Sequence, residues 1–143
     1  MSRFVLDASV SAGWIIPDKL PDYAIQVRQR LVETERALVP GLWAIEMANV
    51  LAKAVRHGTL SANDAEQALG QLQILLIPGR TIDMELTTPS VWQVYDAACK
   101  YQLSAYDACY LELAYREGLP LATLDKGLRA AATKAGVALF KYV

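Results

Sequence analysis

The chain alternates between short apolar runs and longer stretches in which apolar residues recur at helical spacing. The longer stretches predict helices over residues 22–34, 42–57, 61–76, 105–117 and 126–136, and another that begins at Thr88 and Pro89 and runs through Val91, Val94 and Ala98. The short runs "RFVLDAS", "ALVP", "PLATLD" and "VALFKYV" predict buried strands, the first followed by a turn, and "GRTIDM" predicts an edge strand. Strands that alternate with helices indicate an α/β fold around a mainly parallel central sheet.

The length of 143 residues predicts a single domain over 1–143, which can bury a sizeable core. A formal net charge of −1 excludes a globally basic nucleic-acid binder but allows a local basic patch. Cys99 and Cys109 are expected to be free, buried thiols rather than a disulfide. With no signal-peptide pattern and no membrane-length apolar run, the protein is expected to be soluble and cytoplasmic.

Two acidic residues stand where predicted strands end. Asp7 ends the first strand and Asp125 ends the strand before the last predicted helix. In open α/β sheets, ligands bind in the crevice beyond the carboxyl ends of the strands, and both acids are placed for such a site. An Asp after a strand also commonly caps the next helix, so position alone leaves both interpretations open.

Glu46 lies near the start of a predicted helix whose other residues are mostly apolar. An acid there complements the positive end of the helix dipole. Trp43, Met47, Val50 and Leu51 are nevertheless expected to form a stripe facing the core, and an unpaired carboxylate beside it is unfavourable unless something positive compensates it. A functional role for Glu46 is therefore favoured over a structural one.

Asp107 follows Ser104 at the spacing of a helix capping box. The chain contains an internal comparison, because Ser61 and Asp64 have the same spacing. Asp64 lies in the polar segment "SANDAEQ" and is interpreted as part of a cap, whereas Asp107 lies in the apolar segment "LSAYDACYLELA". Spacing does not separate the two cases, but the surroundings favour a functional role for Asp107.

Small hydroxyl residues accompany these acids: Ser9 follows Asp7, Ser104 precedes Asp107, and Thr123 precedes Asp125. Clustered carboxylates repel one another, and a bound cation compensates them. Carboxylate oxygens prefer hard cations such as Mg²⁺ and Mn²⁺. Such a site can activate water and stabilise charge developing on a phosphodiester.

Residues outside the four acids give little support to other catalytic mechanisms. His57, the only histidine, ends a predicted helix before Gly58, where a cation suits the helix dipole. A Ser-His-Asp or Cys-His mechanism therefore has little support, and no glycine-rich phosphate loop appears. Lys126 and Arg129 follow Asp125 and are equally compatible with RNA phosphate binding and with a plain surface role.

The segments "FVLDAS", "AIEMANVL", "LSAYDACYLELA" and "LATLD" resemble, in order and spacing, the motifs of PIN-domain ribonucleases, and the length resembles that of the VapC toxins. The resemblance covers nearly the whole chain. It implies a three-layer α/β/α fold, an Mg²⁺- or Mn²⁺-dependent endoribonuclease, a homodimer and a cognate VapB-like antitoxin that occludes the site. The metal-binding and catalytic acids implied by it are Asp7, Glu46, Asp107 and Asp125, with Ser9 and Thr123 as polar supports.

Two alternatives remain. A phosphatase with an aspartyl nucleophile is disfavoured, because that mechanism expects a second Asp two positions after the first, where this chain has Ser9. The second alternative is a non-catalytic PIN-like module that binds RNA or protein, against which the presence of all the acids argues.

Overall fold

The computed structural model describes residues 2–16 and 21–141, which form a four-stranded parallel sheet and the helices around it. The strands are β1 (Arg3–Leu6), β2 (Arg36–Val39), β3 (Ile82–Met84) and β4 (Leu121–Ala122). The helices are α1 (Ala8–Ile15), α2 (Asp22–Glu33), α3 (Leu42–Arg56), α4 (Ala62–Leu75), α5 (Val91–Tyr101), α6 (Ala105–Glu117) and α7 (Lys126–Ala135).

The strand order is β3-β2-β1-β4, and every pairing is parallel. Val5 of the central strand β1 pairs with Leu38 of β2 on one side and with Leu121 of β4 on the other. The residues that follow β1, β2 and β4 therefore emerge at the same edge of the sheet, close to one another.

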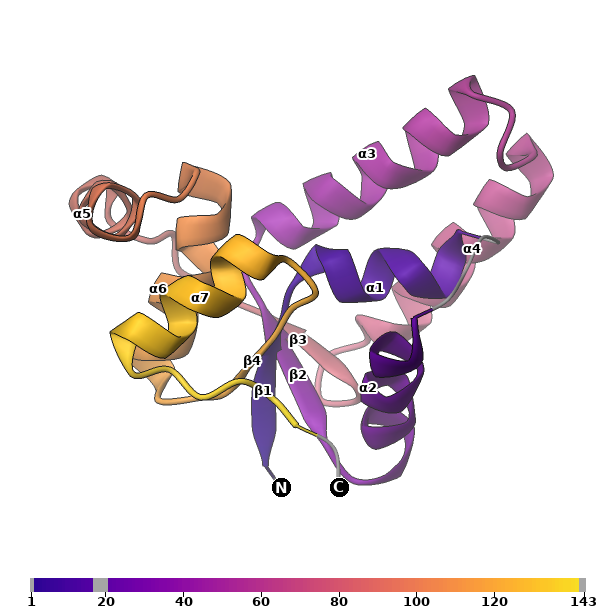
Figure 1. Ribbon diagram of the computed structural model, residues 1–143. Coiled ribbons are helices and arrows are strands. Elements are labelled where there is room, and N and C mark those ends of the chain that lie inside the picture. The colour runs from indigo at the N-terminus through magenta and orange to yellow at the C-terminus, as the bar shows by residue number, and fades with distance from the viewer. Residues whose placement is uncertain (1, 17–20, 142–143) are drawn as a thin grey trace.

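The sheet lies between two groups of helices (Figure 1). Helix α6 packs on β1 and β4 and carries α5 and α7, whereas α1 packs with α2 and α3 on the other side. Helices α3 and α4 form a hairpin that projects away from the sheet (Figure 1). This arrangement confirms the predicted three-layer α/β/α fold with a parallel central sheet.

Strand and helix side chains meet in one buried core. Phe4 of β1 stacks on Phe140 with ring centroids 4.0 Å apart, and Trp43 and Met47 of α3 are almost fully buried. The Trp43 indole N–H donates to the Ser11 hydroxyl of α1 at 3.0 Å. This core fixes the beginning of α3, where Glu46 lies, against α1.

Two predicted segments differ from the structure. Where a turn was expected after β1, residues 8–15 form helix α1, whose short length and small residues give no clear helical spacing in the sequence. It is held by packing and by a 2.8 Å hydrogen bond from Trp14 Nε1 to the Ala24 carbonyl. The predicted last strand reduces, in residues 137–141, to a single bridge between Leu121 and Leu139, and residues 142–143 lie outside the described part.

The structure also tests the expectations about the two cysteines, the buried stripe of α3 and membrane-spanning segments. Both cysteines are free, as expected, but the expected burial is wrong, because Cys99 is exposed and Cys109 is only partly buried. Val50 is partly exposed, so the buried stripe of α3 consists of Trp43, Met47, Leu51 and Ala54. In the described ranges, no helix is both long and apolar enough to cross a membrane.

Candidate active site

A cavity of ≈ 290 Å³ lies at the carboxyl edge of the sheet and brings the predicted acids together. Asp7 reaches it from the end of β1, Glu46 from α3, Asp107 from α6, and Asp125 from the turn between β4 and α7. The remaining lining residues are Ala8, Ser9, Ala12, Asn49 and Val50. Segments far apart in the sequence thus contribute carboxylates to one small space.

Asp7 is buried, with 4% of its surface exposed. It occupies the N-cap position of α1, yet its side chain makes no capping hydrogen bond. Its Oδ2 instead accepts from the hydroxyls of Ser9 at 2.6 Å and Thr123 at 2.7 Å. The backbone N–H of Asp7 donates to the Ala122 carbonyl at 2.9 Å, which places Asp7 beside Thr123. The capping interpretation of this carboxylate is therefore wrong.

Glu46 is held by a residue that sequence analysis missed. Tyr110 of α6 is fully buried, and its hydroxyl donates to Glu46 Oε1 at 2.7 Å. Burial, followed by the nearby Glu46, raises the pKa of Tyr110 far above its usual value, so the phenol stays protonated and remains a donor. In the sequence Tyr110 looks like one more apolar position of α6, three residues after Asp107, which is why no pattern singled it out.

Asp107 lies at the third position of α6, the helix that the Ser104 side chain caps. Its backbone N–H donates to the Ser104 hydroxyl at 3.1 Å, as in a helix cap, while its side chain lines the acidic cavity. Asp64 makes the equivalent bond to Ser61 at 3.0 Å, but it is exposed and lies outside this cavity. The same local motif is therefore used once at the surface and once at the candidate site.

Asp125 caps a helix and also lines the cavity. Its Oδ1 accepts from the backbone N–H of Leu128 at 2.8 Å, and its own N–H donates to the Thr123 hydroxyl at 3.1 Å. Arg129 donates to the Thr123 carbonyl at 2.7 Å and lies over the Tyr23 ring. Arg129 is thus engaged in bracing the turn, whereas Lys126 is exposed at the first position of α7.

The cavity is electrostatically unfavourable for its own carboxylates. Burial raises the pKa of Asp7, Glu46 and Asp107, and neighbouring carboxylates add to the rise in each case. Hydrogen bonds from Ser9, Thr123, Tyr110 and Ser104 act in the opposite direction. A cation in the cavity would relieve both the burial and the mutual repulsion.

The donor set fits a hard divalent cation. Hydroxyl or amide donors occupy Asp7 Oδ2, Glu46 Oε1 and Asp125 Oδ1, which leaves the other oxygen of each carboxylate for a ligand. In the part of the chain that the structure describes, however, no three His, Cys, Asp or Glu side chains are arranged to hold a metal as they stand.

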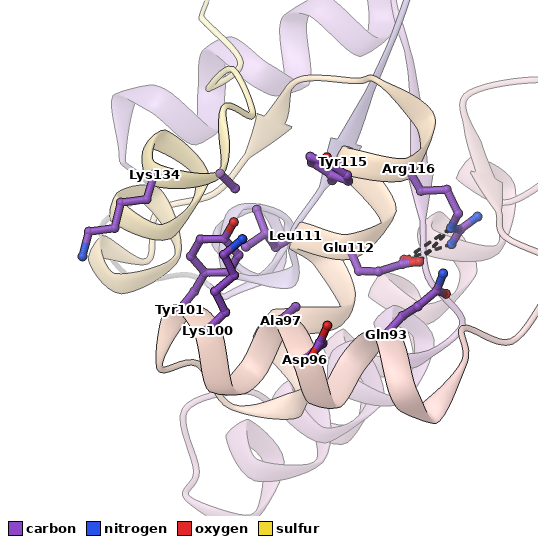
Figure 2. A pocket seen from close by; sticks show the side chains of 11 residues that line it. Gln93, Asp96, Ala97, Lys100, Tyr101, Leu111, Glu112, Tyr115, Arg116 and Lys134 are labelled. Atoms are coloured by element: carbon purple, nitrogen blue, oxygen red, sulfur yellow. Dashed lines mark hydrogen bonds and ion pairs between the residues drawn. The ribbon is translucent and has the colours of Figure 1, made fainter.

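A larger cavity of ≈ 590 Å³ lies between α5, α6 and α7 (Figure 2). Its charged side chains come from Asp96, Lys100, Glu112, Arg116 and Lys134, and Arg116 is paired with Glu112 at 2.8 Å. None of the four predicted acids lines it. The smaller acidic cavity, where the carboxylates converge, is therefore the candidate site.

The chain is similar in sequence and fold to known proteins. The chain is 27% identical to Ribonuclease VapC3 of Pyrobaculum aerophilum over 126 residues, which cover 88% of this chain and 92% of that protein. The crystal structure of PAE2754 from Pyrobaculum aerophilum is similar with a TM-score of 0.67 and 23% identity, covering 91% of this chain and 79% of that one. FitAcB from Neisseria gonorrhoeae is similar with a TM-score of 0.66 and 20% identity, covering 96% of both chains. The family model of the PIN domain matches residues 4–134, and the chain therefore belongs to the PIN-domain family.

Proposed function

We propose that this protein is an Mg²⁺- or Mn²⁺-dependent endoribonuclease that acts as the toxin of a type II toxin–antitoxin pair in the cytoplasm. The observation that carries the proposal is the convergence of Asp7, Glu46, Asp107 and Asp125 on one cavity of a PIN-domain chain. The similarity to a protein named Ribonuclease VapC3 supports RNA as the substrate and a VapB-like antitoxin as the partner.

In this proposal the four acids hold the cation, with Ser9, Thr123 and Tyr110 fixing the carboxylate oxygens that face away from it. When bound, the cation supplies activation of a water molecule and neutralises charge developing on the phosphodiester. Lys126, exposed beside Asp125, binds an RNA phosphate and offsets part of the repulsion between RNA and the acidic cavity.

A test of the proposal is growth arrest on expression without antitoxin, together with cleavage of RNA by the purified protein in Mn²⁺. Arrest and cleavage should both disappear in Asp7→Ala. A well-folded Asp7→Ala protein that still arrests growth would remove the acidic cavity from the mechanism.

One observation favours a second candidate, a PIN-like module that binds RNA or protein without cleaving it. Within the described residues, no ready-made group of metal ligands is present. If this second candidate is right, the purified protein binds RNA or its partner equally well with Mn²⁺ and with a chelator, and cleaves RNA in neither condition.

We also propose that the protein forms a homodimer through an exposed apolar surface on α5, the α5 patch, formed by Val91, Trp92 and Tyr95. These side chains are 86%, 77% and 58% exposed, and the Trp92 and Tyr95 rings stack with centroids 6.0 Å apart. No residue of α5 is buried. Apolar surface of this kind on a helix is typical of a protein–protein contact.

A further inference from the structure

Glu46 is held at the candidate site by a side chain from another helix. It is partly exposed on α3, a helix that packs mainly on α1 and α4, whereas Asp107 and Tyr110 belong to α6. The bond from the Tyr110 hydroxyl to Glu46 Oε1, 2.7 Å long, joins the two helices.

The Tyr110 side chain is a rigid anchor for that bond. None of its surface is accessible to solvent, and it is among the largest fully buried side chains. A tightly packed ring has little rotamer freedom, so its hydroxyl lies at a defined point. The flexible Glu46 side chain takes its orientation from that point.

The bond also selects which oxygen is available. Oε1 is taken by Tyr110, and among the described residues no hydrogen bond to Oε2 is found. Asp7 shows the same division of roles, because Ser9 and Thr123 both bind its Oδ2. Hydroxyl donors thus hold one oxygen of both Glu46 and Asp7 and leave the second for a ligand.

We propose that Tyr110 is a positioning residue of the acidic cavity: its hydroxyl fixes Glu46 so that Oε2 faces the space shared with Asp7, Asp107 and Asp125. The inference rests on the proposed function, since it takes a divalent cation as the ligand. Removing a partner that orients a metal ligand typically weakens metal affinity or activity about 10–100-fold.

The test compares Tyr110→Phe, which removes only the hydroxyl, with Tyr23→Phe. The Tyr23 hydroxyl donates to the Phe140 carbonyl at 2.7 Å, a bond of equal length away from the acidic cavity. Isothermal titration calorimetry measures the Mn²⁺ affinity of the purified proteins, and thermal melts check that each is folded. We expect about tenfold weaker Mn²⁺ binding in Tyr110→Phe, with the affinity of Tyr23→Phe unchanged.

A double-variant cycle separates positioning from a general effect on the fold. In a Glu46→Gln background, adding Tyr110→Phe should produce little further loss of Mn²⁺ affinity, because the bond acts through the Glu46 carboxylate. The comparison in the Glu46→Gln background also tests the positioning role of Tyr110 if Tyr110→Phe alone strongly lowers the melting temperature.

The possible results are distinct. Equal affinity in wild type and Tyr110→Phe, or equal losses in Tyr110→Phe and Tyr23→Phe, would overturn the positioning role while leaving the metal site intact. A wild-type protein that binds no Mn²⁺ would instead overturn the proposed metal-dependent function.

Discussion

The Thr123 hydroxyl donates to Asp7 Oδ2 at 2.7 Å, and so joins two residues 116 positions apart in the chain. Both residues are buried, and the same hydroxyl accepts from the N–H of Asp125. One small side chain therefore connects β1, the end of β4 and the cap of α7. It holds Asp7 and Asp125, two of the acids that line the cavity, next to each other.

This bond predicts that Thr123→Val destabilises the protein although the two side chains have nearly the same shape. The change leaves a buried carboxylate without one of its donors, which should reduce the free energy of unfolding by about 1–3 kcal/mol. Thr123→Ser keeps the hydroxyl and is the matched control. Urea denaturation at neutral pH measures the two, and equal losses would show that the hydroxyl contributes nothing.

The two Ser-x-x-Asp motifs predict a difference in response to metal. In Asp107→Asn the chelated protein should be as stable as wild type or more stable, because one repelling charge is gone while the backbone N–H of residue 107 still donates to the Ser104 hydroxyl. Mn²⁺ at about 100 times its Kd should stabilise wild type by about 2.7 kcal/mol, or roughly 5–10 °C in Tm, and Asp107→Asn much less.

Asp64→Asn is the control for that experiment, because it changes the same motif at the surface. Its Tm should rise with Mn²⁺ as much as that of wild type, and its RNA cleavage should persist. If Asp107→Asn also behaves like wild type, the Asp107 carboxylate is not a metal ligand.

The raised pKa of Asp107 predicts a pH dependence of the chelated protein. Burial, with Asp125 and Asp7 nearby, raises this pKa above its ordinary value of 3.8. When the pKa of a carboxyl is higher in the folded state than in the unfolded state, its contribution to stability is present at pH values below the pKa of the unfolded state. That contribution is lost as pH rises through the pKa of the folded state. Wild type and Asp107→Asn should therefore be similarly stable near pH 3.8, and the Asn variant should gain relative to wild type as pH increases. Denaturation curves at several pH values measure this difference; a constant difference contradicts the shift.

Substitutions of Lys126 and Arg129 should have different effects, although the two residues are only three positions apart in the chain. Lys126→Ala should raise KM for RNA and lower the salt dependence of binding by about one phosphate contact, with stability unchanged. Arg129→Ala should instead lower stability by about 1 kcal/mol, because the guanidinium binds the Thr123 carbonyl. Filter binding over a salt series and thermal melts distinguish the two.

The α5 patch predicts that Trp92→Glu converts a dimer to a monomer, because a carboxylate in the centre of an apolar contact is costly to bury. Light scattering at micromolar concentration measures the mass. Val32→Glu is the control, since Val32 is 78% exposed on α2, outside the patch. A monomeric wild type, or dimers that survive Trp92→Glu, would contradict this surface.

The sequence predicted the helices best where apolar residues recur at helical spacing over a long stretch and polar residues mark the ends, as in α3 and α6. It missed α1, because the small residues from Ala8 to Gly13 form a helix only through packing on α2 and α3. It also gave too long a last strand, since in the described residues 137–141 only Leu139 bridges to the sheet. Local patterns do not contain the tertiary contacts that decide such segments.

The candidate acids were found because acids at the ends of strands and helices are visible in sequence, and the parallel order brings those ends to one edge. Their hydrogen-bond partners were visible only in part. Ser9 and Thr123 adjoin the acids closely in sequence, but Tyr110 reaches Glu46 across 64 positions. Whether an acid caps a helix also depended on tertiary contacts: Asp125 caps α7, whereas the Asp7 carboxylate binds the hydroxyls of Ser9 and Thr123.

The order of the strands has a consequence for synthesis on the ribosome. Asp7 is made at the beginning of the chain, yet its partner Thr123 and the neighbouring Asp125 are made near the end. A nascent chain that stops before residue 121 lacks β4, so its central strand has an unpaired edge and its cavity lacks one wall. Incomplete translation products therefore carry the early motifs without an assembled site, and any harmful activity of this cavity begins only when the last strand is in place.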